Sequence, residues 1–170
     1  MFDRQSGGRD VSDNYLRLIP TDPHYMPPDE AGRRASLVVS HALPAADRVQ
    51  VKRHSQPVFI DQGTNLESVL CPRCRARVAF YGDTATATSE WWKQIADQLG
   101  GQQVADVRVT MSCCGSSVMF QELQFEWPAG VASFEISIRN PGIGEPLGPE
   151  LVAQLEGILG CGIRQVWAHY

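Results

Sequence analysis

The sequence predicts an α+β protein in which an antiparallel sheet, covered by two helices, is interrupted by a metal-binding insert. Three observations lead to this prediction. Alternating apolar residues near both ends of the chain indicate short strands. Each pair of these strands encloses one amphipathic helical pattern. In the middle, Cys71-Pro72-Arg73-Cys74 and Cys113-Cys114-Gly115 supply four thiols.

The overall composition is that of an ordinary globular protein. Of the 170 residues, 43% are hydrophobic and 20% are charged, which is enough apolar material for a sizeable core. No apolar run approaches the roughly 18 residues that a membrane-spanning helix needs, so we expect no membrane partner. Residues 1–13 are polar and lack an apolar signal-peptide segment, and they are therefore predicted to be a disordered leader.

Charge and cysteine content narrow the class of function. The formal net charge of -4 argues against nucleic acid, because duplex binding depends on a basic surface that neutralises phosphates. Five cysteines, four of them in two close pairs, are typical of thiolate ligands in a reducing compartment. We therefore expect a cytoplasmic protein.

Residues 14–60 predict a strand, a helix and a second strand. Residues 15–19 alternate, and Pro20 is expected to end that strand. Pro28 suits the first helical position and the acidic pair after it suits the helix dipole, so a helix is expected to reach 43–44. Its expected inner face consists of Ala31, Ala35, Val38 and Ala42. Residues 47–54 return as a strand, which 57–60 either extend or pair with.

Residues 128–170 repeat this plan. Phe134, Ile136 and Ile138 alternate with polar residues and predict a half-buried strand. Pro149 is expected to open a helix and Gly160 to close it. Its apolar face is Leu151, Leu155, Ile158 and Leu159. The last strand covers 163–170, with Val166, Ala168 and Tyr170 on one face and Trp167 on the other.

Two such halves predict a ferredoxin-like βαβ…βαβ core with both helices on one face of a four-stranded antiparallel sheet. Neither half could bury its apolar helix face alone. The expected shared core is Leu16, Leu18, Val38, Val51, Phe134, Ile136, Ile138, Leu151, Leu155 and Val166.

The insert, residues 61–127, is predicted to be a zinc ribbon enlarged by one helix. Strands are expected over 78–81, 104–111 and 123–127, with a polar loop over 84–88. Ser89 can cap a helix that ends at Gly100-Gly101. One ring of the pair Trp91-Trp92 should lie in the insert's core, and the other should pack on the sheet or anchor a partner.

Cys71, Cys74, Cys113 and Cys114 are the predicted metal ligands. Four thiolates close a tetrahedral structural Zn²⁺ site with no open position. Iron in the same cage, and thiols that bind no metal, remain the alternatives.

The second thiol pair departs from the usual spacing. A standard turn would place a ligand at Met111 together with Cys114, whereas here the additional thiol is the adjacent Cys113. Cys161 and His54 are therefore alternative fourth ligands. For Cys161, the other interpretation is a small buried residue at a helix end.

Two further groups have both a functional and a structural interpretation. Arg73, Arg75 and Arg77 flank the first thiol pair. They are expected to support the negatively charged metal centre rather than to form a phosphate-binding ridge. His54, His169 and Trp127 are expected near one another at the sheet edge beside the insert, where a catalytic role would need them.

Several motifs together resemble a known group of proteins. They are the two thiol motifs, Trp127-Pro128-Ala129-Gly130, Arg139-Asn140-Pro141 and residues 159–170, which read LGCGIRQVWAHY. With them the chain resembles a group of small uncharacterised bacterial zinc-ribbon-like proteins, some of which carry a sugar-transporter ATPase label. The sequence has no P-loop to support ATP hydrolysis. The resemblance implies a shared fold and transfers no activity.

We expect a non-enzymatic zinc-binding protein that acts by protein–protein recognition, as an immunity-type or adaptor protein. The alternative is a small-molecule sensor or an enzyme that uses the edge near His54 and His169. Nucleic-acid binding through the zinc ribbon is the third hypothesis. A deep pocket with two convergent polar side chains would favour the alternative, and a flat aromatic surface would favour protein recognition.

Overall fold

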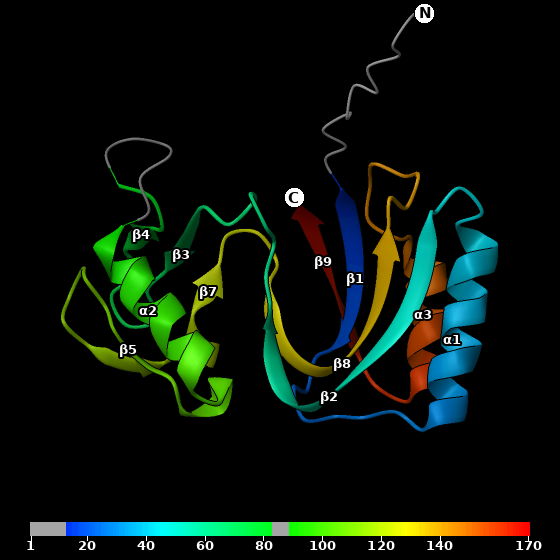
Figure 1. The fold of residues 1–170 in the computed structure, drawn as a ribbon, viewed down its shortest axis with the longest axis horizontal. Helices are drawn as coiled ribbons and strands as arrows, with labels where there is room; N and C mark the ends of the chain where they lie inside the picture. The colour runs from blue at the N-terminus through cyan, green and yellow to red at the C-terminus, as the bar shows by residue number, and fades with distance from the viewer. Residues whose placement is uncertain (1–12, 83–88) are drawn as a thin grey trace, which may run out of the picture.

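The computed structural model describes residues 13–82 and 89–170. Within these ranges the chain forms three helices and three antiparallel sheets, an α+β arrangement in two parts that lie side by side (Figure 1). The predicted leader up to residue 12 and the predicted loop 84–88 lie outside the described residues. Among the helices that are described, none combines the length and the apolar character needed to cross a membrane.

The larger part is built on a four-stranded sheet. Its strands are β1 (Asn14–Pro20), β2 (Arg48–Ile60), β8 (Gly130–Arg139) and β9 (Ile163–His169). They lie in the order β2-β8-β1-β9, and each neighbouring pair is antiparallel. β2 and β9 are therefore the two edge strands.

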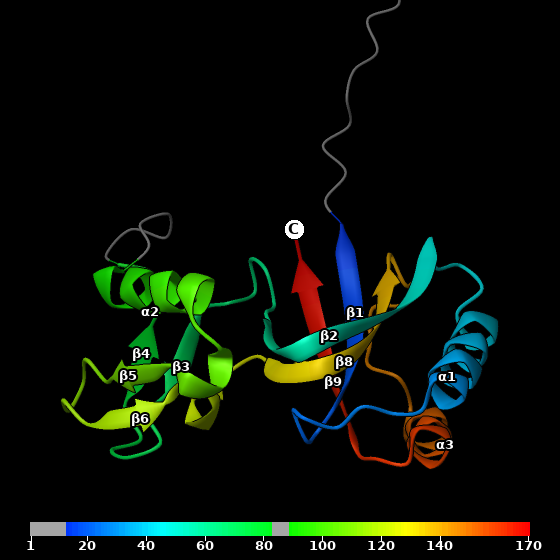
Figure 2. The ribbon, with the colours of Figure 1, turned by 60° about the horizontal axis from the view of Figure 1, so that its bottom comes forward.

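Two helices cover one face of this sheet. They are α1 (Asp29–Ala42) and α3 (Pro149–Leu159), which lie together on the same side (Figure 2). As predicted, α3 begins with Pro149 and ends at Gly160, whose φ of 76° is the left-handed conformation that glycine favours. The predicted inner face of α1 was partly wrong: Gly32, Ala35 and Val39 are buried, and Ala31 and Ala42 are not.

The core between sheet and helices matches most of the predicted residues. Leu16, Leu18, Phe134, Ile136, Ile138 and Leu155 are all buried in one cluster, and Val38, Val51 and Leu151 pack at its edge. Val166 is an exception: it belongs to a separate cluster with Ile19, Ile60 and Ala132. Side chains alternate between the two faces of a strand, and Val166 lies on the face opposite Trp167, which packs against the helix side.

This second cluster exists because the sheet curls. β2 runs without a break to Ile60, so residues 57–60 extend it, and its register against β8 shifts between Arg53 and Val58. Such a shift bends a strand and increases its twist. The bend brings the chain after β2 to β9, where Gly63 bridges His169. A Cβ at Gly63 would lie 2.1 Å from the His169 carbonyl oxygen, so only glycine fits there.

As a result β8 is buried on both faces. The sequence predicted a half-buried strand, but Ser133, Glu135 and Ser137 are as inaccessible as the apolar residues between them. A carboxylate is thus enclosed on the side of the sheet that carries no helix. Burial of a charge is unfavourable unless it is paired, so Glu135 must have partners.

The smaller part, the insert, contains two small sheets and one helix. One sheet has the order β4-β3-β7, with β3 (Ser68–Leu70), β4 (Arg77–Ala79) and β7 (Gln124–Phe125). The other pairs β5 (Arg108–Thr110) with β6 (Ser117–Met119). The helix α2 (Glu90–Gly101) begins after Ser89, whose hydroxyl accepts from the Trp92 N–H as predicted.

Several expected bounds in the insert were wrong. The expected strand over 104–111 is a 3₁₀ turn, η1 (Val104–Asp106), followed by β5. A second 3₁₀ turn, η2 (Phe120–Glu122), precedes β7, which is shorter than the expected 123–127. The end of α2, in contrast, was predicted correctly, because Gly100 and Gly101 are its last two residues.

The insert has a core of its own. Phe80, Phe120 and Ile95 are buried in it together with apolar residues of every small strand except β7, whose Phe125 packs at its edge. Trp91 and Trp92 both pack against this core, and the Trp92 ring also meets Phe59 of β2 edge to face, with ring centres 6.4 Å apart, so one of the two rings packs on the sheet as expected. Phe59 and Val131, which belong to β2 and β8, pack against it too. Aromatic contacts therefore join the two parts.

The last residue of the predicted leader is ordered. The Asp13 N–H donates to the Tyr170 carbonyl at 3.0 Å, and its carboxylate accepts from the Arg139 guanidinium at 2.9 Å. The prediction of disorder was therefore wrong at this residue.

Truncation of Leu155 tests the shared core. Leu155 is fully buried, so Leu155→Ala should lower the free energy of unfolding by about 2–5 kcal/mol. Leu37→Ala is the matched control, because Leu37 on α1 is 69% exposed and its truncation should change stability by less than about 0.5 kcal/mol. Urea unfolding followed by circular dichroism measures both. Equal effects of the two substitutions would contradict the assignment of the core.

Candidate metal centre and charged sheet face

The first pair of thiols lies in a tight turn between β3 and β4. The Cys71 N–H donates to the Ala76 carbonyl at 2.9 Å, and the Arg75 N–H donates to the Cys71 carbonyl at 3.0 Å. Arg75 adopts a left-handed conformation with φ of 64°. The Arg73 N–H points at the Cys71 sulfur at 3.4 Å. The turn therefore aims backbone donors at a sulfur that can be a thiolate.

The second pair lies in a turn with the same hydrogen bonds, between β5 and β6. Here the Met111 N–H donates to the Ser116 carbonyl at 2.9 Å, and the Gly115 N–H donates to the Met111 carbonyl at 2.8 Å. Gly115, with φ of 70°, stands where Arg75 stands in the first turn. Met111 therefore occupies the place of Cys71, and Cys114 the place of Cys74.

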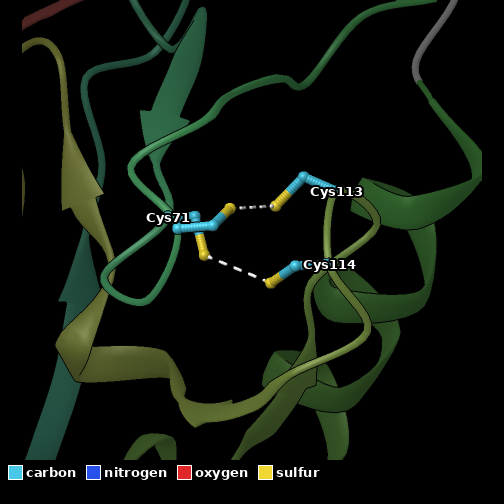
Figure 3. A group of neighbouring side chains, drawn as sticks. Cys71, Cys113 and Cys114 are labelled. Atoms are coloured by element: carbon cyan, nitrogen blue, oxygen red, sulfur yellow. Dashed lines mark hydrogen bonds between the residues drawn. The ribbon is translucent and has the colours of Figure 1, made fainter.

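The second turn has Met111 where the first turn has a thiol, and Cys113, the residue before Cys114, supplies the fourth sulfur instead. Met111 is buried in the insert's core, and Cys113 turns toward the first pair instead (Figure 3). The Cys74 and Cys113 sulfurs are 3.4 Å apart, and the Cys71 and Cys114 sulfurs are 3.8 Å apart. All four sulfurs lie within 4.8 Å of one another, so this cluster could hold a metal ion.

The four thiols differ in acidity. The backbone N–H of Cys74 is the main cause that lowers the pKa of the Cys71 thiol to about 6. The Ser116 hydroxyl lowers the pKa of Cys114. Desolvation within the cluster, followed by the neighbouring thiols, raises the pKa of Cys113 to about 12, although the residue as a whole is exposed. Like charges this close disfavour ionisation, so four thiolates need a cation among them.

The alternative fourth ligands lie elsewhere. Cys161 follows the C-terminal end of α3 at the edge of the sheet's core, where desolvation raises its pKa. His54 lies on β2 beside Glu135. Among the described residues, only the four predicted cysteines form the cluster.

The arginines around the first turn are paired with one segment of the insert. The guanidinium groups of Arg73 and Arg75 contact Glu122 at 3.4 Å and Gln124 at 2.8 Å. Arg77 makes two bonds of 2.8 Å to Glu126, and Ser68 also bonds to this carboxylate. Arg77 first, then Ser68, lowers the pKa of Glu126 to about 2. These arginines tie the thiol turn to the chain around β7, as a supporting role requires.

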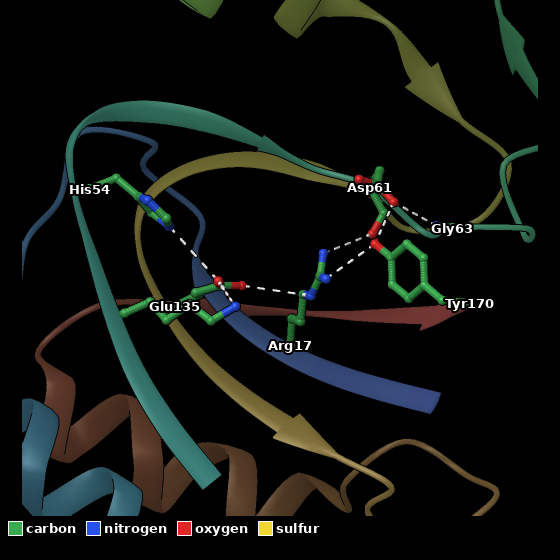
Figure 4. Close-up of polar contacts among 7 residues, drawn as sticks. Arg17, His54, Asp61, Gly63, Glu135 and Tyr170 are labelled. Atoms are coloured by element: carbon green, nitrogen blue, oxygen red, sulfur yellow. Dashed lines mark hydrogen bonds and ion pairs between the residues drawn. The ribbon is translucent and has the colours of Figure 1, made fainter. Parts of the chain in front are cut away.

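The helix-free side of the sheet carries a second group of candidate side chains, which we call the charged face: Arg17, His54 and Glu135, labelled in Figure 4, and Lys52, which is paired with Glu135. The Glu135 carboxylate lies 2.9 Å from the Lys52 ammonium. It lies 3.8 Å from His54 Nε2 and 3.8 Å from Arg17 Nε. Arg17 Nε, His54 Nε2 and Glu135 Oε2 are buried and have no hydrogen-bond partner. The basic side chains of Arg17, Lys52 and His54 therefore converge on one buried carboxylate.

Arg17 connects this carboxylate to the end of the chain described here. Its guanidinium donates to the Tyr170 hydroxyl at 3.1 Å and to the Asp61 carbonyl at 3.4 Å. The Tyr170 hydroxyl donates to the Asp61 carboxylate at 2.7 Å. Burial, followed by this hydrogen bond, raises the pKa of Tyr170 to about 12. The curl of the sheet brings Arg17 of β1 together with Asp61 and Tyr170, the residues that directly follow β2 and β9.

His54, His169 and Trp127 were expected to lie near one another, and this was wrong because the two histidines lie on different strands and different faces of the sheet. β2 and β9 are opposite edges of the sheet, and His54 lies on the charged face. The His169 ring instead contacts Asn14 Oδ1 at 2.8 Å on the other face. Gln62 links the backbones of His169 and Trp127: its carbonyl accepts from the His169 N–H, and its side-chain amide donates to the Trp127 carbonyl.

Sequence reasoning missed Arg17 and Glu135. Both occupy polar positions of an alternating strand pattern, which normally indicates solvent exposure. Only the length of β2, 13 residues with a proline inside, signalled a bend that could cover them.

Comparison of the chain with protein-family models, curated proteins and solved structures gives no match. The resemblance to bacterial zinc-ribbon-like proteins therefore stays a prediction.

Substitution of Cys113 tests the fourth ligand. Cys113→Ser should weaken metal binding by at least about tenfold, since even groups that only support a ligand contribute about 10–100-fold. Cys161→Ser is the matched control and should leave affinity unchanged, because Cys161 lies outside the cluster. Competition with a metal-binding dye measures both. Metal loss in the Cys161 variant alone would show that the ligand set is wrong.

Proposed function

We propose that the four cysteines hold one structural Zn²⁺. In a tetrahedral site with Zn–S bonds of about 2.3 Å, the sulfurs lie about 3.8 Å apart. The sulfur separations of 3.4 and 3.8 Å support this geometry. Four protein ligands leave no position for a substrate, so this zinc stabilises the fold and takes no part in catalysis. Zinc is preferred to iron because nothing in the insert requires a redox role.

We infer that the sheet with α1 and α3 is a ferredoxin-like core, residues 14–60 and 128–170, and that residues 61–127 are a zinc-ribbon-like insert. The order of the two βαβ halves and the strand order β2-β8-β1-β9 support the core. Two similar thiol turns, each between short strands, support the ribbon. The sheet with its helices and the insert have separate hydrophobic clusters, which supports these residue bounds. Phe59 and Val131, from β2 and β8, pack against the cluster of the insert.

Our proposal for the whole protein is non-enzymatic recognition of another protein in the cytoplasm, as an immunity-type or adaptor protein. The observation that carries it is an open cleft of about 970 Å³ between the two parts. Residues 53–59 of β2 form one wall, and residues 99–104 at the end of α2 form the other. Arg53 and His54 are the titratable residues that line it, and they do not make a catalytic set.

The cleft suits a polypeptide segment. The register shift between Arg53 and Val58 leaves backbone groups of an edge strand without sheet partners. Ser55, Gln56, Gln102 and Gln103 add side chains that can donate and accept hydrogen bonds. Backbone pairing to an edge strand is a common way in which proteins bind extended segments.

Small-molecule binding is the second candidate. It is supported by the convergence of Arg17, His54 and Glu135 on the charged face, because buried polar groups without partners gather at ligand sites. Nucleic-acid binding is disfavoured by the net charge of -4.

Metal removal tests the zinc proposal. Elemental analysis of protein made without chelator should give about one zinc per chain. Chelation should first increase hydrogen exchange in residues 61–127, because binding free energy of a structural site is largely folding free energy. Residues 14–60 and 128–170 should keep their protection. Absence of zinc would refute the site, and joint loss of protection by 14–60 and the insert would refute the bounds.

Blocking the cleft tests protein recognition. A host protein that co-purifies with the chain would be identified, purified and titrated against it by calorimetry. Gln56→Trp should weaken that binding by at least about tenfold, because Gln56 lines the cleft and a bulky ring at this position would obstruct the bound segment. Gln94→Trp on α2 is the control, since Gln94 is exposed and does not line the cleft. Equal affinities for both variants, or no saturable host partner, would contradict the proposal.

A further inference from the structure

The helix-free side of the sheet contains a small pocket next to the charged face. Its volume is about 120 Å³. Six residues line it: Tyr15, Arg48, Gln50, Lys52, Ser137 and Arg139. Arg139 pairs with both Tyr15 and Arg48 across the sheet, and Ser137 pairs with Gln50. The six side chains therefore come from adjacent positions on three neighbouring strands, which are rigid supports for a binding site.

The lining is rich in hydrogen-bond donors that have no other use. Within the described ranges, the Arg48 side chain makes no ion pair or hydrogen bond to another residue, and neither does the hydroxyl of Tyr15 or Ser137. Lys52 uses one of its three N–H groups on Glu135. Arg139 uses Nε and Nη2 on Asp13, which leaves Nη1.

Three cations line the pocket and no carboxylate does. Carboxylates close to these cations are already engaged: Glu135 by Lys52, Asp13 by Arg139, and Asp47 by the Asn140 side-chain amide. Glu135 is itself 2% exposed, does not line the pocket, and lies among Arg17, Lys52 and His54. In a chain of net charge -4, this pocket is a local concentration of positive charge.

We propose that this pocket binds the phosphate group of a small molecule. A phosphate monoester carries about -1.5 to -2 charges at pH 7 and three acceptor oxygens, which match three cations and two hydroxyls. A carboxylate has two oxygens and one charge, and it would leave donors unpaired. Arg48 supplies the planar fork that binds two oxygens of one phosphate, and Ser137, a residue with little exposed surface, supplies a hydroxyl that lines the pocket.

The size and position of the pocket limit the ligand. A volume of about 120 Å³ is roughly four times the ~30 Å³ that one water occupies, enough for one phosphate group and little more. The remainder of the molecule would extend over the exposed side chains of Arg48 and Gln50. The proposal rests on the second candidate function, small-molecule binding. It is independent of zinc and of the cleft.

Calorimetric titration at constant ionic strength tests the site, with inorganic phosphate, glycerol 3-phosphate, sulfate and acetate as probes. The zinc-loaded wild-type chain should bind phosphate with one-to-one stoichiometry. Sulfate should also bind, and acetate should bind at least about tenfold more weakly, because it lacks the third oxygen and second charge. Tighter binding of glycerol 3-phosphate than of inorganic phosphate would identify a phosphate ester as the natural class of ligand.

The variants are chosen so that the fold is kept. Arg48→Gln should weaken phosphate binding by at least about tenfold, since it removes a charge-assisted contact. Ser137→Ala, which removes one uncharged hydroxyl from the lining, should weaken it by a smaller factor. Arg34→Gln is the control: it makes the same charge change at an exposed position of α1, and affinity should be unchanged.

Three results would overturn the proposal: no saturable binding of phosphate, equal affinity for acetate, or equal losses in the Arg48 and Arg34 variants. Zinc content and partner binding should be the same in Arg48→Gln as in the wild type. A failure of this site can therefore be told apart from a failure of the zinc or cleft proposals.

Discussion

The insert depends on the contact between its two thiol turns, which brings four sulfurs within 4.8 Å of one another. Its strands have two or three residues each, and they form two separate sheets. Sheets this small are not stable alone in water. The buried cluster around Phe80 and Phe120 covers one side of them, but the turns themselves carry three exposed thiols and little apolar surface. A shared cation would hold the turns together where packing cannot.

The larger part obeys a different constraint, the burial of β8 on both faces. Phe134, Ile136 and Ile138 face α1 and α3, and the curl of β2 encloses Ser133, Glu135 and Ser137 on the other side. A buried carboxylate must be paired, and Lys52, Arg17 and His54 are the groups that reach it. Positive charge therefore accumulates on the helix-free side, and the pocket beside it contains more donors than the fold itself uses.

The sequence could predict features that depend on local chemistry. Pro149 and Gly160 mark the ends of α3, Ser89 caps α2, and the thiol spacing identifies the cluster. The bounds of the short strands β4, β5 and β7 were predicted only roughly, and β3 and β6 were missed, because two or three residues are too few for an alternating pattern. Burial of Glu135 could not be predicted either, since it follows from a bend between Arg53 and Val58 that covers a distant strand. The curvature of a sheet produces no periodic pattern of apolar residues, so it cannot be found in the way that helices and strands are.

The cleft and the metal cluster are mechanically related. One wall of the cleft belongs to β2, which the four-stranded sheet holds, and the other belongs to the end of α2, which the insert's core holds. Phe59 is shared, because it lines the cleft and contacts Phe120 with ring centres 4.9 Å apart. Loss of the cation would loosen the insert and leave the sheet in place, so only one wall would move. A metal ion that takes no part in chemistry would thereby set the width of the site where recognition is proposed.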